Sequence, residues 1–247
     1  MSKALITGGS SGIGLEIARE LSKQGYSVIL VGRDIDNLTK AAKSIKNSHI
    51  ITLDLSIEAN CYKLFKMFKD IDILINNAGF GIWGEFKKTD LKEELNMIEL
   101  NIKALHILTK LYLKEFVKKD RGYILNVASF AAFASGPLMA TYYATKAYVL
   151  KLTTAINHEL KVNKSNVVIS ALCSGPVDTG FNKRAGVHFS IKPLSSKFVA
   201  KYALLNMYNK QMVIIPGLMA KMASIVCKLL PLRLIMTFCY LVQWNKK

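Results

Sequence analysis

The stretch Tyr142-Tyr-Ala-Thr-Lys146 places a phenol and an ammonium group where they could act on the same proton. Residues four apart lie on one face of a helix, so both side chains can point into one cleft. A free tyrosine has a pKa of about 10, and a neighbouring cation favours the phenolate and lowers that pKa toward neutrality. On its own, this spacing more often marks an ordinary helix with a half-buried tyrosine and an exposed lysine. Tyr143 is the rival phenol, three residues before the lysine.

A second stretch, Thr7-Gly-Gly-Ser-Ser-Gly-Ile-Gly14, could hold a phosphate. It has the spacing G-x-x-x-G-x-G and lies between an expected strand and an expected helix. Glycines permit a tight turn and a close approach of the backbone, and a helix N-terminus presents oriented N–H groups to a pyrophosphate. The alternative is a plain glycine turn, which the further motifs along the chain disfavour.

Apolar runs and helical spacings alternate along the chain and must position these residues. Strands are expected at 4–7, 27–31, 49–53, 71–75, 122–127, 166–172 and 212–215. Helices are expected at 13–24, 36–46, 57–69, 90–118, 141–162 and 196–209. Such alternation predicts a parallel sheet that is covered on both faces and binds ligands at the carboxyl ends of its strands. The fold class is therefore α/β: one Rossmann-fold domain over 1–217 with a doubly wound, seven-stranded parallel sheet, and an apolar, basic helical extension over 218–247.

Over residues 3–216 the chain resembles the short-chain dehydrogenase/reductase family. Asn76-Asn-Ala-Gly79 matches the family element that lines the cofactor cleft, and Asp54 matches the position that contacts the adenine. Gly175-Pro-Val177 with Thr179 matches the segment that holds the nicotinamide carboxamide. The cofactor contacts that the resemblance implies come from Gly8, Ser10, Ser11, Gly12, Ile13, Gly14, Arg33, Asp54, Leu55, Asn77, Ala78, Gly79, Tyr142, Lys146, Val177 and Thr179.

The residues after the second strand indicate NADP(H) as the cofactor. An NAD-specific fold places an acidic residue there to bind the ribose 2′-hydroxyl, whereas NADP enzymes avoid that charge and supply arginine. By the resemblance, Gly32 occupies the acidic position and Arg33 follows it. Ser10 and Ser11 could add hydroxyl contacts to the phosphate. Asp34 should point away, although a shift of one residue would reverse this interpretation.

The resemblance also implies a catalytic set of Asn101, Ser129, Tyr142 and Lys146. Ser129 lies 13 residues before Tyr142, where the family's serine hydrogen-bonds the substrate carbonyl; a turn cap is the alternative. Asn101, a poor helix former within an expected helix, matches the asparagine whose kink holds a water in a proton relay to Lys146. Tyr142 would exchange a proton with the substrate oxygen during hydride transfer. Lys146 would tune Tyr142 and bind the nicotinamide ribose.

Charge and composition exclude other classes of protein. The 51% hydrophobic content excludes intrinsic disorder despite a net charge of +17. Only five of the 34 basic residues are arginine, which disfavours nucleic acid as a partner. All 17 acidic residues lie at or before Asp178, so the rest of the chain carries eleven cations and no acid. This asymmetry favours an anionic surface or ligand, with a solvated lysine-rich face as an equal alternative.

Two segments are expected to set the choice of substrate. Residues 180–195 resemble a mobile lid, and 218–247 form the tail. The tail is nearly all apolar over 218–230 and 232–242, broken by Lys221, Lys228, Pro231 and Arg233. A membrane span needs about 20 mostly apolar residues, and the cations and the proline disfavour one. Two amphipathic helices fit better, either on a bilayer surface or packed against a partner subunit or the active site.

The leading interpretation is an NADPH-dependent carbonyl reductase or alcohol dehydrogenase that acts on a small apolar ketone, lipid-like or steroid-like. One alternative is a non-catalytic NADP-binding sensor or scaffold, which the intact catalytic set disfavours. The other is an epimerase or dehydratase relative, which the glycine spacing disfavours.

The cysteines, the histidines and the N-terminal residues indicate whether the protein binds a metal and in which cellular compartment it works. The four cysteines and four histidines lack metal-ligand spacing, so no metal is predicted. The cysteines are expected to be buried and reduced, and no signal peptide is expected. These features indicate a cytoplasmic protein, associated with membranes if the tail lies on a bilayer. The resemblance further implies a homodimer or homotetramer built through helices 90–118 and 141–162.

Overall fold

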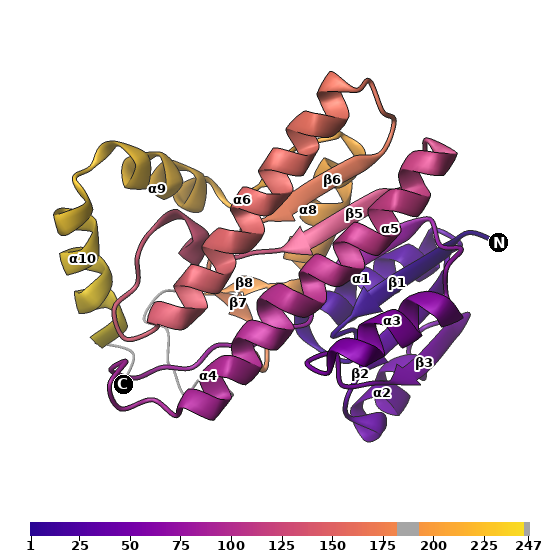
Figure 1. The fold of residues 1–247 in the computed structure, drawn as a ribbon, viewed down its shortest axis with the longest axis horizontal. Helices are drawn as coiled ribbons and strands as arrows, with labels where there is room; N and C mark the ends of the chain where they lie inside the picture. Colours follow the sequence, from indigo (N-terminus) through magenta and orange to yellow (C-terminus); the bar gives the residue numbers. More distant parts are fainter. Residues whose placement is uncertain (182–192, 245–247) are drawn as a thin grey trace.

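Seven parallel strands form one sheet at the centre of the molecule (Figure 1). The computed structural model describes residues 1–181 and 193–244, and the sheet order is β3-β2-β1-β4-β5-β6-β9. The strands are β1 (Lys3–Thr7), β2 (Ser27–Gly32), β3 (Ser48–Thr52), β4 (Ile73–Asn76), β5 (Tyr123–Val127), β6 (Val168–Leu172) and β9 (Val213–Ile214). The predicted seven-stranded parallel sheet is thus confirmed.

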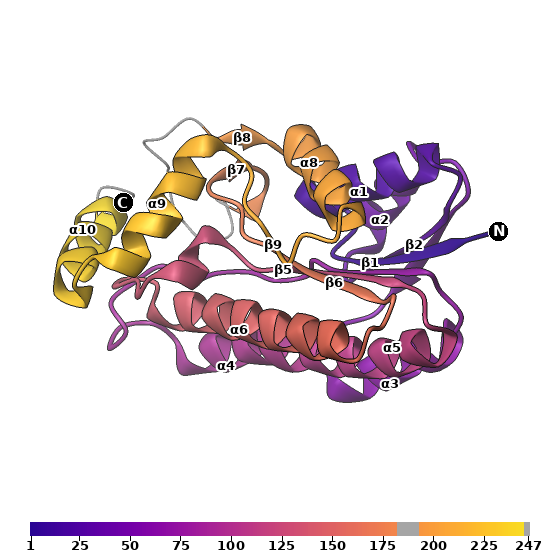
Figure 2. The ribbon, with the colours of Figure 1, turned by 90° about the horizontal axis from the view of Figure 1, so that it is seen from above.

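Helices cover both faces of this sheet. Figure 2 shows α1, α2 and α8 on one face and α3 to α6 on the other. The bounds are α1 (Gly12–Lys23), α2 (Ile35–Ala42), α8 (Ser196–Tyr208), α3 (Glu58–Met67), α4 (Leu91–Ile98), α5 (Leu105–Lys119) and α6 (Ala140–Val162). Short elements complete the chain: a π-helix η1 (Glu99–Ala104), a 3-10 turn η2 (Phe130–Phe133), and two-residue strands β7 (Val177–Asp178) and β8 (Leu194–Ser195), which pair with each other.

The apolar runs of the strands follow from burial on both faces. Successive side chains of a strand point to opposite faces of the sheet. In β1, Ile6 packs among residues of α1 such as Ile17, whereas Leu5 packs on the other face with Leu64 of α3. A strand buried in this way needs apolar residues at every position, and this is why no polar alternation appears in the sequence.

The long helix expected over 90–118 is interrupted by η1, which is a difference from the prediction. The π-helical turn contains Asn101, whose side chain is buried and turned toward the backbone of Phe80. A π-bulge widens one helical turn and is common at functional sites. An interruption near Asn101 was expected, but its form depends on contacts that lie far along the chain.

Other boundaries also differ from the expected ones. The helix expected over 36–46 ends at Ala42, where the hydroxyl of Ser44 donates to the backbone of Ala41. The seventh strand has only two residues, and the small β7–β8 sheet was not expected. Its strands are too short to leave a periodic signal.

Two helices follow the sheet, as predicted for the extension: α9 (Leu218–Leu229) and α10 (Leu232–Trp244). Figure 1 shows them at one end of the molecule, beside the start of α6 and away from β1 and β2. Within residues 1–181 and 193–244, neither helix nor any other has the length and hydropathy needed to cross a bilayer. The division of the chain at residue 217 stays a prediction.

Candidate active site

The carboxyl ends of β1 and β4 lie side by side at the centre of the sheet, where the direction of the chain crossover changes. Thr7 links these two ends, because its hydroxyl accepts hydrogen bonds from the backbone N–H groups of Asn77 and Ala78, both at 3.0 Å. Asn77 in turn donates from Nδ2 to the carbonyl oxygens of Thr7 and Gly8. Ligands of doubly wound sheets bind at such a switch point. The predicted glycine loop and the Asn77–Gly79 segment therefore meet there.

The glycine loop fits a pyrophosphate. Gly12 has φ +55°, and a Cβ on Gly14 would lie 2.4 Å from Asn77 Nδ2 and 2.5 Å from the carbonyl oxygen of Gly8. Only glycine is tolerated at positions so tightly packed. The N-terminus of α1 carries no side-chain cap on its N–H groups and no acidic residue in its first turn. Uncapped N–H groups and the helix dipole favour an anion at this point.

The segment predicted to hold the nicotinamide carboxamide reaches the same loop. A Cβ on Gly12 would lie 2.9 Å from Thr179 Cγ2. Val177 is buried and belongs to β7. Of the other predicted cofactor contacts, Leu55 is buried, Ser10 and Ile13 are half-buried and Ser11 is exposed.

Arg33 and Asp54 face each other beyond the ends of β2 and β3, with Arg33 Nη1 3.4 Å from Asp54 Oδ2. Burial raises the pKa of Asp54, but hydrogen bonds from the hydroxyl and N–H of Ser56 outweigh this, so that pKa lies below its usual range. Asp34 accepts from the N–H of Asn37 and caps α2. The carboxylate of Asp34 is thus engaged by its own helix, and Arg33 is the cation beside Asp54.

Tyr142 and Lys146 are buried one helical turn apart near the start of α6. Lys146 Nζ donates to the carbonyl oxygen of Val127 at 2.8 Å and lies 5.8 Å from the centre of the Tyr142 ring. Burial lowers the pKa of Lys146 to about 8. Burial also raises the pKa of Tyr142 to about 12, and a hydrogen bond from Ser129 opposes this rise. The expected lowering of the tyrosine pKa by Lys146 is not found: burial raises this pKa, and Ser129 rather than Lys146 opposes the rise.

Ser129 is half-buried and lies directly after β5, next to Tyr142. Its Oγ also accepts from the N–H of Ala131 at 3.1 Å and caps η2. The two interpretations of this serine are therefore compatible: the turn cap fixes the position of the hydroxyl that meets Tyr142.

Asn101 is held by hydrogen bonds to residues that neighbour Lys146 and Tyr142. Its Oδ1 accepts from the N–H of Phe80, and its Nδ2 donates to the Phe80 carbonyl oxygen at 2.8 Å and to Thr145 Oγ1 at 3.2 Å. A Cβ on Gly79 would lie 2.8 Å from Asn101 Oδ1 and 3.5 Å from Lys146 Nζ. The structure thus brings Asn101, Gly79 and Lys146 together.

Several residues of the site were not predicted. Thr7 joins the two strand ends, and Thr145 Oγ1 donates to the Tyr142 carbonyl oxygen at 2.7 Å. A Cβ on Gly81 would collide with Phe181, Tyr142 and Met139, and the Phe181 ring centre lies 5.3 Å from that of Tyr142. Thr7 directly precedes the glycine loop, and Gly81 lies two residues after the Asn76–Gly79 element. Their nearness to these motifs is the one feature of the sequence that could have indicated a role in the site.

Two further predictions concern the segment over 180–195 and the burial of the cysteines. Most of the lid expected over 180–195 lies outside the described residues. Cys61 and Cys173 are buried as expected, whereas Cys227 and Cys239 are only half-buried, because the extension is only partly covered.

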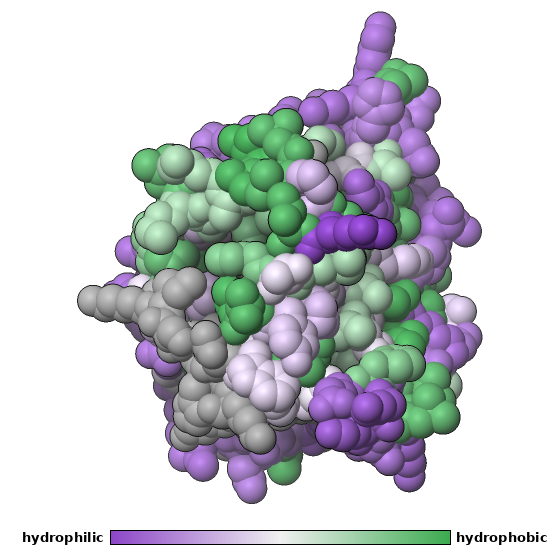
Figure 3. Space-filling model, turned by 90° about the vertical axis from the view of Figure 1, so that its left-hand side faces the viewer, coloured by the Kyte–Doolittle hydropathy of each residue, from purple (hydrophilic) through white to green (hydrophobic). Residues whose placement is uncertain are grey.

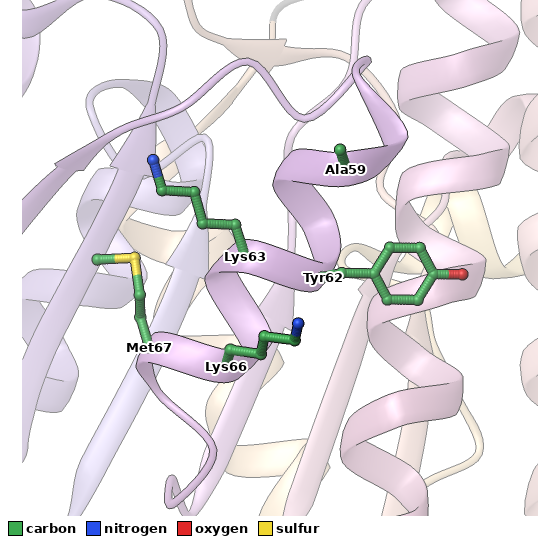
Figure 4. A pocket seen from close by; sticks show the side chains of 5 residues that line it. All are labelled: Ala59, Tyr62, Lys63, Lys66 and Met67. Atoms are coloured by element: carbon green, nitrogen blue, oxygen red, sulfur yellow. The ribbon is translucent and has the colours of Figure 1, made fainter.

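A hollow of about 660 Å³ on the outer side of α3 shares no residue with this site. Its lining residues are Ala59, Tyr62, Lys63, Lys66 and Met67. Figure 4 shows Tyr62 on one side of the helix and Lys63 and Met67 on the other, so the side chains do not converge on a bound group.

Comparison with known proteins agrees with this geometry. The family model described as "short chain dehydrogenase" matches residues 2–188, and the extension lies beyond that match. An uncharacterized oxidoreductase of Staphylococcus epidermidis is 34% identical over 182 residues, 71% of this chain and 78% of its own length. The very-long-chain 3-oxoacyl-CoA reductase of Coccidioides immitis is 36% identical over 172 residues, 65% of this chain and 49% of its own length.

Among solved structures, a short-chain dehydrogenase from Sphingobium yanoikuyae in complex with NADPH superposes with a TM-score of 0.83. It is 30% identical, and the match covers 92% of each chain. With a family model that matches most of the sequence and a sheet of seven parallel strands as predicted, the chain belongs to the short-chain dehydrogenase/reductase family and is an oxidoreductase with a nicotinamide cofactor.

Proposed function

We propose that the protein is an NADPH-dependent carbonyl reductase that acts on a small apolar ketone. The observation that carries this proposal is the meeting of Ser129 and Tyr142 beside Lys146, next to a glycine loop that fits a pyrophosphate. A phenol and a hydroxyl that face one point suit the oxygen of a carbonyl group, which must receive a proton and a hydrogen bond as it is reduced.

The loop Gly8–Gly14 would hold the pyrophosphate, and Arg33 with Ser10 and Ser11 the 2′-phosphate. The other residues named for the cofactor by the resemblance would line the rest of its cleft, with Asp54 and Leu55 toward the adenine, Asn77 to Gly79 along the middle, and Val177 and Thr179 toward the nicotinamide. When bound, the cofactor supplies a hydride to the substrate carbonyl carbon.

The chain's own residues would handle the proton. Tyr142, with its pKa raised to about 12 by burial, stays protonated at neutral pH and can donate its proton to the substrate oxygen. Ser129 would hydrogen-bond the same oxygen as negative charge develops on it. Asn101 acts as a positioning residue, because it ties the π-helical turn to Phe80 and Thr145. Because burial keeps Tyr142 protonated at neutral pH, its proton is available for the substrate oxygen, which is the form that reduction requires.

The rate of reduction should fall as the pH rises above about 8. Lys146 has its pKa lowered to about 8 by burial, so it is cationic below that pH and neutral above it. If the ammonium group binds the cofactor ribose and stabilises the phenolate left on Tyr142, kcat/KM should drop about tenfold per pH unit above the break. Stopped-flow NADPH oxidation between pH 6 and 10 measures this. A profile that is flat to pH 10 would argue against a role for the Lys146 charge.

Replacing Arg33 by alanine should remove the preference for NADPH. A charge-assisted bond is worth about 1.5–3 kcal/mol, so we expect NADPH affinity to fall about 10- to 100-fold while NADH affinity changes little. Arg19→Ala is a matched control, because Arg19 is similarly exposed and pairs with Glu16 on the outer side of α1. An unchanged ratio of NADPH to NADH affinity in Arg33→Ala would contradict the assignment of NADP(H).

The apolar substrate class is supported by the aromatic and apolar residues beside Tyr142, such as Phe181 and Met139. It is also supported by a relative that is a very-long-chain 3-oxoacyl-CoA reductase. A cytoplasmic location and a homodimer or homotetramer through the helices over 90–118 (α4, η1 and α5) and 141–162 (α6) remain predictions. Screening NADPH oxidation against short and long ketones, quinones and 3-oxoacyl derivatives tests the proposal; no turnover with any of them would favour an NADP-binding sensor instead.

A further inference from the structure

The helical extension exposes an unusually apolar surface. Nearly half of the large hydrophobic side chains that are exposed in the described residues lie between Leu218 and Trp244. Leu229 is 77% exposed and Phe238 68% exposed, whereas Ile235 and Gln243 are buried and hold α10 to the rest of the protein. Figure 3 shows apolar side chains gathered on this end of the molecule. A contiguous apolar patch of this kind marks a site of interaction with a protein or a membrane.

The same surface is basic and has no acidic residue. Lys221 and Arg233 are both exposed, and within the described residues neither forms an ion pair. Lys221 Nζ lies 5.6 Å from the centre of the Tyr202 ring, which leaves its charge uncompensated. No acidic residue follows Asp178. Exposed apolar residues with cations among them are the features of a helix that lies in the plane of an anionic bilayer.

A second copy of the chain suits this surface less well. A twofold interface brings the same patch of both subunits together. Here it would place two acid-free, cationic patches against each other, with no carboxylate to pair with Lys221 or Arg233. Anionic phospholipid head groups supply the missing negative charge, and acyl chains accept the apolar residues.

The surface borders the candidate active site on two sides. α9 packs against η2, the turn that Ser129 caps. Gln243 of α10 donates from Nε2 to the hydroxyl of Tyr143, the neighbour of Tyr142. Trp83 Nε1 donates to the carbonyl oxygen of Gln243 at 3.1 Å. A ketone that leaves an apolar phase at this surface would therefore be close to Tyr142.

We propose that the α9–α10 surface docks on a bilayer that contains anionic phospholipid, and that the ketone reaches Tyr142 from that bilayer. The docking is peripheral, since α9 and α10 are too short to span. The statement about the ketone rests on the proposed reductase function, whereas the docking itself does not.

Co-sedimentation of the full chain with vesicles tests the docking. We use vesicles of phosphatidylcholine alone and of phosphatidylcholine with 30% phosphatidylglycerol, and expect preferential binding to the latter that weakens as salt is added. Each cation near an anionic surface contributes about fivefold to binding, so Lys221→Gln/Arg233→Gln should weaken it about 25-fold. The control Lys110→Gln/Lys161→Gln removes two exposed cations from other helices and should bind like the wild type.

The apolar contribution is tested in the same way. Leu229→Ser/Phe238→Ser should weaken binding to anionic vesicles at least about tenfold, since both side chains would lose their burial in the interface. Ile57→Ser/Val162→Ser is the matched control, because these residues are 55% and 66% exposed on other elements. Because all four positions are exposed, the fold should be kept, as circular dichroism can check.

The outcomes separate the docking from the reductase function. Absence of binding to anionic vesicles at low salt, or equal binding of the surface variants and their controls, overturns the docking. A wild-type dimer that Leu229→Ser/Phe238→Ser converts to a monomer overturns it in favour of self-association. If docking delivers the ketone, both surface variants should lose turnover of a long-chain ketone dissolved in vesicles but keep turnover of a short water-soluble one. If both surface variants still turn over the long-chain ketone in vesicles, delivery of the ketone from the bilayer is refuted. If the wild type turns over no ketone at all, the reductase function is refuted and the docking is not affected.

Discussion

Tyr142→Phe should lower kcat for ketone reduction by about 10³-fold, because proton transfer by a positioned side chain contributes about 10²- to 10⁴-fold. The variant keeps the ring that packs against Phe181 and loses only the hydroxyl that meets Ser129. We therefore expect a folded protein with wild-type affinity for NADPH. Steady-state NADPH oxidation and a fluorescence titration of NADPH binding measure the two quantities.

Tyr143→Phe is the matched control for this variant. Tyr143 is the adjacent tyrosine of α6, and its hydroxyl accepts from Gln243 rather than facing Ser129. Its loss should cost about 1 kcal/mol of stability and leave most of the activity on a water-soluble ketone. If Tyr143→Phe loses turnover and Tyr142→Phe keeps it, the proton donor has been assigned to the wrong tyrosine.

Lys146→Met should also cause a large loss, but of a different kind. Lys146 would bind the cofactor ribose and stabilise the phenolate, so its removal should raise the KM for NADPH about tenfold and lower kcat about 10²-fold. The change in KM distinguishes it from Tyr142→Phe, where KM stays the same. Steady-state kinetics with NADPH as the varied substrate checks both numbers.

Lys151→Met is the matched control, because Lys151 lies further along α6 and is exposed. It should keep wild-type kinetics. A Lys146→Met variant that binds and turns over NADPH normally would refute the role of the buried ammonium group.

The sheet and the glycine loop could be predicted because local sequence determines them. Strands that are buried on both faces, such as β2 with Val28 to Val31, need continuous apolar residues. Part of the need for glycine is also local, since Gly12 has φ +55° and a Cβ on Gly14 would lie 2.5 Å from the carbonyl oxygen of Gly8 in the same turn. The position of Tyr142 and Lys146 on one helix face follows from their spacing alone.

The remaining features depend on contacts between distant segments. The π-helical turn at Asn101 depends on Phe80 and Thr145, so spacing within the helix could not reveal it. The pKa of Tyr142 depends on the burial created when the surrounding segments pack around it, and this reversed the expected direction of its shift. The carbonyl oxygen of Val127 as the partner of Lys146 is a backbone contact that no side-chain pattern encodes.

The hydride transfer itself is tested most directly with NADPH that carries deuterium at both hydrogen positions of nicotinamide C4, so that either face of the ring delivers deuterium. Wild-type protein is incubated with this cofactor and a ketone that it turns over, and the alcohol is analysed by mass spectrometry. We expect one deuterium at the carbinol carbon of the product, and about 10³-fold slower appearance of that product with Tyr142→Phe. An alcohol without deuterium, or NADPH consumed without any alcohol, would contradict the assignment of the protein as a reductase of ketones.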